Sequence, residues 1–253
     1  MIKLSANRLK TFLECKNKYF LHYICGMETP KNIFLIRGTS VHAAFEAYHR
    51  GENPFTAYNV TWLAEMAAAP HVEHVSRIFL EGYDYIETYI QHQDVPRQDV
   101  QRQDAQTEVY FCLPFPNEHK PLAFLKGYID LIVHPQTANA TGVIVDYKTS
   151  KDKPKALDDD LQFIIYAWAY EQLYKQPAII YWYHCRTGEY IQANVHGDDK
   201  LKKVHDVVAA VLEYNKDPQF EVRAPCRWCI ARDTCSGVAL GADALGADVR
   251  ANV

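Results

Sequence analysis

The sequence predicts an α/β protein in which a mixed sheet is flanked by helices, with a helical portion at the N-terminus and a cysteine cluster near the C-terminus. Three observations support this prediction. Apolar residues recur at helical spacing through residues 1–92, runs of β-forming residues follow in 107–195, and three of the seven cysteines lie within 226–235. A hydrophobic period that changes along the chain is typical of helices packed on a sheet.

The helical predictions depend on apolar residues spaced three or four apart. Ser5 is a suitable N-cap for the first helix. The polar segment 93–105 is expected to be a linker or exposed loop because it is nearly free of large apolar side chains. Helices are expected at about residues 5–24, 38–50, 71–92, 157–174 and 200–215.

The strand predictions depend on short β-forming runs separated by Pro, Asn and Gly. The run Val-Ile-Val at 143–145 is typical of a strand buried on both faces in the middle of a sheet. Strands are expected at about residues 107–113, 124–133, 142–148, 178–185 and 190–195.

Length and composition favour an ordinary globular protein. The chain has 253 residues, of which 48% are hydrophobic, and a formal net charge of −4. This charge argues against non-specific coating of nucleic acid, which needs many Lys and Arg side chains to neutralise phosphates. We expect one domain over residues 1–236, made of a helical portion (1–95), a core (106–215) and a cysteine cluster (216–236), and then a poorly ordered tail (237–253).

Localisation and cysteine chemistry are linked. No apolar run approaches the roughly 20 residues of a membrane helix, and the N-terminus lacks the apolar core of a signal peptide, so a cytoplasmic protein is expected. Cysteines in a reducing compartment are metal ligands or buried thiols more often than disulfides. Cys25, Cys112 and Cys185 lie in apolar contexts and are expected to be buried thiols.

Two acidic residues and a lysine form the candidate chemical site. Asp146 and Lys148 end the apolar strand at a spacing of two, which places both side chains on one face. Asp130 stands among apolar residues of the preceding strand, where a shared divalent metal would compensate its buried charge. Carboxylate oxygens favour Mg²⁺ or Mn²⁺ over zinc. Glu108 could add another ligand or be solvated, and Asp146 with Lys148 could be an ion pair at a strand end.

Further motifs accompany this site. They are Arg37-Gly-Thr-Ser-Val-His42, Gln162-Phe-Ile-Ile-Tyr166, and Cys15 with the C-terminal Cys226, Cys229 and Cys235. Together with Asp130 and Asp146-Tyr147-Lys148, these residues resemble the RecB-like branch of the PD-(D/E)XK nucleases, including AddB-type and CRISPR-associated enzymes with a four-cysteine motif. Lys16 departs from this pattern, because many relatives have proline after the first cysteine.

The resemblance implies a restriction-endonuclease-like fold and a metal-dependent DNA exonuclease. It implies that His42, Asp130, Asp146 and the Tyr147 carbonyl bind Mg²⁺ or Mn²⁺, and that Lys148 acts in catalysis with Asp130 and Asp146. Gln162, Tyr166 and Arg37 are implied to orient the site and contact the substrate. Judged from the residues alone, His42 could be an ordinary histidine, Gln162 and Tyr166 a packing pair, and the acids at 158–160 a metal cluster or first-turn acids of a helix.

The resemblance also implies that Cys15, Cys226, Cys229 and Cys235 bind a [4Fe–4S] cluster. The spacing alone fits a structural zinc site equally well. The implied partners are DNA, as single strands or ends, and a helicase or a recombination or CRISPR adaptation protein. The alternative function is a subunit with a nuclease fold that binds DNA ends or a helicase without cutting.

Overall fold

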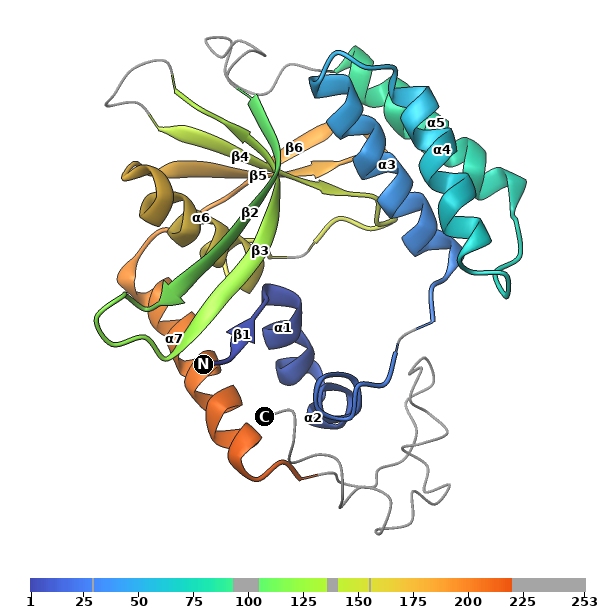
Figure 1. Cartoon of the computed structure of the whole chain (residues 1–253). Helices are drawn as coiled ribbons and strands as arrows, with labels where there is room; N and C mark the ends of the chain where they lie inside the picture. The colour runs from blue at the N-terminus through green and yellow to red at the C-terminus, as the bar shows by residue number, and fades with distance from the viewer. Residues whose placement is uncertain (29, 93–104, 136–140, 155, 220–253) are drawn as a thin grey trace. The chain divides into compact units, whose positions relative to one another are not determined.

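The computed structural model describes residues 1–28, 30–92, 105–135, 141–154 and 156–219 (Figure 1). Residues 93–104 of the predicted linker, the tail and the three C-terminal cysteines Cys226, Cys229 and Cys235 lie outside these residues, whereas Ala105 begins a strand. No helix in the described part of the chain is long and apolar enough to cross a membrane.

The predicted α/β class is confirmed by a six-stranded mixed sheet flanked by helices. The strand order is β1-β3-β4-β5-β6, and β2 pairs with β3. The strands are β1 (Lys3–Leu4), β2 (Ala105–Phe115), β3 (Ala123–Val133), β4 (Gly142–Lys148), β5 (Ala178–His184) and β6 (Glu189–Ala193). The helices are α1 (Ala6–Glu14), α2 (Lys16–Tyr19), the π-helix η1 (Phe20–Ile24), α3 (Ile33–His49), α4 (Pro54–Ala67), α5 (Ser76–Gln91), α6 (Leu161–Tyr174) and α7 (Asp198–Lys216).

The chain divides into two compact units. One comprises Met1–Pro30, Cys112–Gly127 and Asp198–Val253, and the other comprises Lys31–Phe111 and Tyr128–Gly197. Strands β2 and β3 each run from one unit into the other. All the described candidate metal, catalytic and substrate residues belong to the second unit, whereas Cys15 belongs to the first.

The first predicted helix is interrupted at Cys15. Ser5 caps α1 as expected, since its Oγ accepts from the Arg8 N–H at 3.3 Å. Cys15 then takes an extended backbone, and its Sγ accepts from the Lys18 N–H at 3.5 Å to begin α2. A continuous helix to residue 24 was therefore a wrong prediction, because apolar periodicity does not reveal a cap inside the run.

Helix α4 was not predicted, although its start carries local signals. Asn53 Oδ1 accepts from the Thr56 N–H at 3.0 Å, and Pro54 occupies the first turn, where its missing N–H costs nothing. The next predicted helix, at 71–92, is shorter in the structure and begins at Ser76.

Strand β4 forms the centre of the second unit. Its predicted bounds are those of the structure, and all but its last residue, Lys148, are buried. It pairs antiparallel with β3, with Leu131 opposite Val145, and parallel with β5, with Lys148 opposite His184. Helices α3, α4 and α5 share a hydrophobic core with one face of β3, β4 and β5, while α6 packs against β5 (Figure 1).

Candidate functional site

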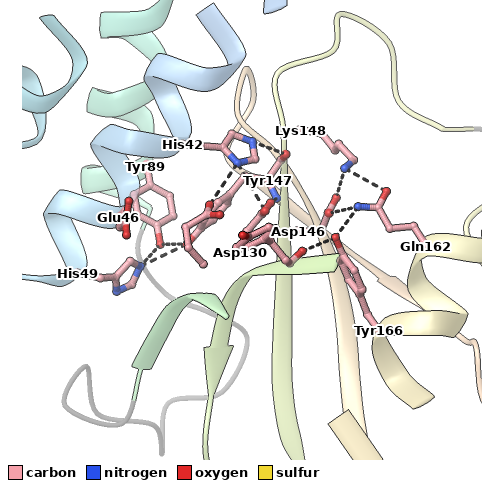
Figure 2. Close-up of polar contacts among 12 residues, drawn as sticks. His42, Glu46, His49, Tyr89, Asp130, Asp146, Tyr147, Lys148, Gln162 and Tyr166 are labelled. Atoms are coloured by element: carbon pink, nitrogen blue, oxygen red, sulfur yellow. Dashed lines mark hydrogen bonds and ion pairs between the residues drawn. The ribbon is translucent and has the colours of Figure 1, made fainter. Parts of the chain in front are cut away.

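The candidate site begins where β3 and β4 lie side by side. Asp130 on β3 and Asp146 on β4 are almost completely buried. The Tyr147 N–H donates to Asp130 Oδ2 at 2.8 Å, so the backbone of one strand binds the carboxylate of the other. Asp130 therefore lies beside the segment of β4 that carries Asp146 (Figure 2).

Helix α3 adds His42 to these acids. Its Nε2 lies 3.1 Å from the Tyr147 carbonyl oxygen, and its Nδ1 lies 3.5 Å from Asp130 Oδ1 and 3.9 Å from Glu108 Oε1. Ligand atoms of His42, Glu108 and Asp130 all lie within 4.8 Å of one another. One imidazole and two carboxylates at this separation form a donor set suitable for Mg²⁺ or Mn²⁺.

Glu108 on β2 has an unusual backbone. Its φ is +49°, in the left-handed region, which costs a non-glycine residue about 1 kcal/mol or more. Strained residues of this kind cluster at functional sites. The sequence predicts Glu108 only as an optional ligand, because no local signal indicates the left-handed backbone at this residue.

The electrostatics of the site show how strongly its charges interact. Burial alone would lower the pKa of His42, but Asp130 and Asp146 raise that pKa to about 9. Burial would raise the pKa of Asp130, but His42 and Lys148 hold it below its usual value. For Asp146, burial and the neighbouring Asp130 raise the pKa against the opposing effect of Lys148. The carboxylates of this cluster therefore favour positive charge on the neighbouring His42 and Lys148.

Lys148 and helix α6 surround Asp146 on the other side. Lys148 Nζ lies 2.5 Å from Asp146 Oδ2, so the two side chains form an ion pair. The angles at this oxygen are not those of a regular hydrogen bond. Gln162 Nε2 donates to Asp146 Oδ1 at 2.9 Å, and Gln162 Oε1 lies 3.5 Å from Lys148 Nζ. One amide thus contacts both members of the ion pair.

Tyr166 extends this network to β3. Gln162 Nε2 also donates to the Tyr166 hydroxyl at 2.8 Å, which donates to the Tyr128 carbonyl at 2.6 Å. The structure therefore brings Gln162 and Tyr166 to the acids. The preceding acids differ from expectation: Asp160 is the N-cap of α6, and Asp158 accepts from the Asn194 N–H at 2.8 Å, so neither is a first-turn acid.

The side chain of Tyr147 points away from Asp146 into a polar cluster within the aromatic core. Its hydroxyl lies 2.8 Å from the Tyr89 hydroxyl and 3.3 Å from His49 Nε2, and these two partners are 2.6 Å apart (Figure 2). Burial lowers the pKa of His49 to about 4, so His49 is neutral near pH 7. Tyr147 is thus anchored by its side chain while its backbone contacts Asp130 and His42.

Three consecutive carbonyls that begin at Lys148 are each held by a different group. The Lys148 carbonyl accepts from the Cys185 N–H at 3.0 Å, the Thr149 carbonyl from Arg37 Nη2 at 2.8 Å, and the Ser150 carbonyl lies 3.0 Å from His184 Nε2. These contacts fix the end of β4 and hence the backbone that carries Lys148. His184 was not among the predicted site residues, because its partner is distant in the sequence.

Arg37 is buried, and its guanidinium joins two segments. It forms a close ion pair with Glu81 of α5 as well as the bond to Thr149. At Gly38, a Cβ atom would lie 3.3 Å from Thr149 Oγ1, so the glycine allows α3 to approach this loop closely. These contacts are structural, and a substrate contact of Arg37 stays a prediction.

Replacing Arg37 with lysine is expected to lower the free energy of unfolding by about 2 kcal/mol, because an ammonium cannot reproduce the fork that contacts Glu81 and Thr149 together. Denaturant titration measures this change. Arg77→Lys is the matched control, since Arg77 pairs with the same Glu81 but its side chain is 85% exposed. Equal effects of the two substitutions would contradict the role given to Arg37.

The described cysteines have different environments. Cys185 is buried, as predicted, whereas Cys15, Cys25 and Cys112 are only partly buried. The expectation of buried thiols is therefore wrong for Cys25, which follows the end of η1, and for Cys112, which lies on the mostly half-buried strand β2. Among the described residues all four cysteines are free thiols.

Known proteins have a similar sequence pattern and a similar fold. Residues 3–236 match the family described as the PD-(D/E)XK nuclease superfamily. The fold is similar to the crystal structure of a "Putative exonuclease" from Eubacterium rectale, with a TM-score of 0.58 and 16% identity over 92% of this chain and 87% of that one. The crystal structure of SSO0001 aligns with a TM-score of 0.36 at 16% identity, over 91% of this chain and 95% of that one. No curated protein matches the sequence.

Proposed function

Because the chain belongs to the PD-(D/E)XK nuclease superfamily, we propose that its site hydrolyses phosphodiester bonds of DNA, removing nucleotides from strand ends. The observation that supports this proposal most directly is the contact network itself. His42, Glu108 and Asp130 converge on one point, and Lys148 is paired with Asp146 beside them. A metal-binding donor set beside an ammonium group suits metal-dependent hydrolysis of a phosphodiester.

The residues present fit a divalent metal. His42, Asp130, the Tyr147 carbonyl and Asp146 would hold Mg²⁺ or Mn²⁺, and Glu108 offers a further oxygen. Asp146 Oδ2 is already paired with the Lys148 ammonium at 2.5 Å, and its second lone pair could bind the ion. When bound, such an ion polarises the scissile phosphate and lowers the pKa of a bound water.

The protein side chains perform the remaining tasks. Lys148 positions the attacking water and stabilises the negative charge that develops on the phosphate. Asp146 and Gln162 hold the Lys148 ammonium. Burial would lower the pKa of Lys148, but the carboxylates of Asp146 and Asp130 keep that pKa above its ordinary value. Lys148 therefore remains charged near neutral pH. Gln162 and Tyr166 are proposed to orient the site and to contact the DNA backbone.

The alternative is a subunit that binds DNA ends or a helicase without cutting. The intact set of Asp130, Asp146 and Lys148, with its mutual contacts, favours the enzyme. The test is release of nucleotides from end-labelled single-stranded and duplex DNA with Mn²⁺, Mg²⁺ or EDTA. Metal-dependent release that end-blocking suppresses is the expected result. Binding without cleavage in either metal would support the alternative, and cleavage of end-blocked circles would contradict the exonuclease mode.

We also propose that Cys15 binds a [4Fe–4S] cluster with Cys226, Cys229 and Cys235. Cys15 is a partly buried free thiol at the junction of α1 and α2, an accessible position for a ligand. The proposal rests on the sequence motif, and zinc is the alternative metal. Iron and sulfide analysis distinguishes them: about four of each per chain supports the cluster, and one zinc without sulfide refutes it.

Serine at position 15 is expected to remove the brown absorption of the cluster and to destabilise the protein. Four shared ligands would close a loop of about 210 residues, and chain entropy estimated as for a disulfide sets roughly 5 kcal/mol as the upper limit of that constraint. Visible absorption and thermal melting measure the two effects. The control is Cys112→Ser, which replaces another partly buried thiol and should leave the protein coloured. A coloured and normally stable Cys15→Ser variant would show that Cys15 is not a ligand.

The cellular setting is proposed on the same motifs. A RecB-like enzyme of this kind would act on DNA in the cytoplasm, with a helicase or a recombination or CRISPR adaptation protein as partner. Co-purification of the full chain with its genomic neighbours tests the partner.

A further inference from the structure

Two tyrosines beside the candidate site expose their rings. Tyr110 on β2 and Tyr128 on β3 are 50% and 55% exposed, whereas many aromatic side chains of the second unit are buried. Their ring centroids are 5.0 Å apart with an interplanar angle of 47°. The two rings therefore form one exposed aromatic surface, here called the tyrosine pair.

The tyrosine pair is tied to the acids by short stretches of strand. Tyr110 follows Glu108 by two residues and Tyr128 precedes Asp130 by two, a separation of about 7 Å along a strand. The Tyr128 backbone is also fixed by the bond from Tyr166, which belongs to the network around Asp146. A nucleic acid whose phosphate reaches these acids would pass its neighbouring nucleotides close to the two rings.

Exposed aromatic rings next to a phosphate-cleaving site have a specific chemical use. A tyrosine ring stacks on any base, and only bases that are not paired in a duplex leave a face free for it. We propose that Tyr110 and Tyr128 are a stacking platform for the unpaired bases of a single-stranded nucleic acid held in the site. This inference rests on the proposed nuclease function and narrows its substrate to a strand that is single-stranded near the cut.

The net charge supports stacking as a source of affinity. With a formal charge of −4, the chain has no overall surplus of Lys and Arg to attract phosphates. Stacking does not depend on charge, and it would add affinity without displacing counterions. The contribution of the tyrosine pair should therefore be independent of salt concentration, which distinguishes it from a phosphate contact.

The test compares alanine and phenylalanine at both positions. The Tyr110→Ala/Tyr128→Ala double variant should weaken binding of a fluorescent single-stranded oligonucleotide by about 5-fold or more, as loss of base stacking predicts. Binding is measured by anisotropy without divalent metal, so that cleavage is not required. Replacing both tyrosines with phenylalanine should retain affinity because the rings remain. Leu63→Ala on α4, which removes a side chain that is 68% exposed, is the control for loss of apolar surface.

An oligonucleotide with abasic positions identifies the stacking partner. The unchanged protein should bind it more weakly than the normal strand, and the double alanine variant should bind both equally. With metal, the double variant should raise KM more than it lowers kcat, and the slope of affinity against salt should not change.

Several outcomes would overturn the inference. If the double variant melted at a lower temperature but bound the normal strand with unchanged affinity, the tyrosine pair would be only a cross-strand packing contact. An equal loss of duplex and single-strand binding would refute base stacking. If the unchanged protein bound the oligonucleotide but released no nucleotides with either metal, the proposed function would fail while the binding comparison still tested the platform.

Discussion

Replacing Asp130 with asparagine is expected to reduce metal-dependent cleavage by at least 10³-fold. Asparagine keeps an oxygen that can accept from the Tyr147 N–H, now 2.8 Å from Asp130 Oδ2, so the pairing of β3 with β4 should survive. It removes the negative charge that stands 3.5 Å from His42 and belongs to the donor set. The lower cleavage rate should therefore result from lost metal binding and not from unfolding. Its size is the scale expected when electrostatic and metal catalysis are removed.

Two measurements establish the cause. Calorimetry should show loss of Mn²⁺ binding by Asp130→Asn, and circular dichroism should show an unchanged fold. Asp206→Asn is the control, because Asp206 is an exposed acid on α7 paired with Lys202. Mn²⁺-dependent cleavage by Asp130→Asn at the rate of the unchanged protein would refute the site.

Replacing Lys148 with methionine is expected to lower kcat by about 10²- to 10³-fold while Mn²⁺ binding persists. Methionine has similar length but no charge, so it can neither position the water nor stabilise charge on the phosphate. The ammonium lies 2.5 Å from Asp146 Oδ2. Removing it leaves this carboxylate oxygen free, so metal affinity should be equal or higher.

The Lys148→Met variant should lose catalytic rate without losing affinity for Mn²⁺, and this difference identifies a catalytic role. Single-turnover kinetics at saturating DNA measures the chemical step, and calorimetry measures the affinity for Mn²⁺. Lys202→Met changes a lysine on α7 whose side chain is 74% exposed and should leave both quantities near their original values. If Lys148→Met lost metal affinity in proportion to its activity, Lys148 would have a structural role instead.

Several elements could be predicted because their signals are local. The bounds of β4 follow from a run of β-forming residues that is typical of a strand buried on both faces. The spacing of two between Asp146 and Lys148 predicts that their side chains share one face of that strand. The interruption at Cys15 and the helix Pro54–Ala67 were missed. In both cases the deciding signal is one capping contact, at Cys15 or Asn53, which a search for apolar periodicity overlooks.

The amino-acid sequence by itself determined the sheet-and-helix class and indicated which residue types could form the candidate site, since hydrophobic period and side-chain chemistry are properties of short segments. Only the tertiary structure decided which distant groups complete the site. Arg37 reaches the Thr149 carbonyl across 112 positions, and His184 reaches Ser150 across 34. Glu108 joins His42 and Asp130 through a left-handed backbone. Such contacts depend on how the helices pack on the sheet and on which polar groups are buried there, and burial is a property of the whole fold.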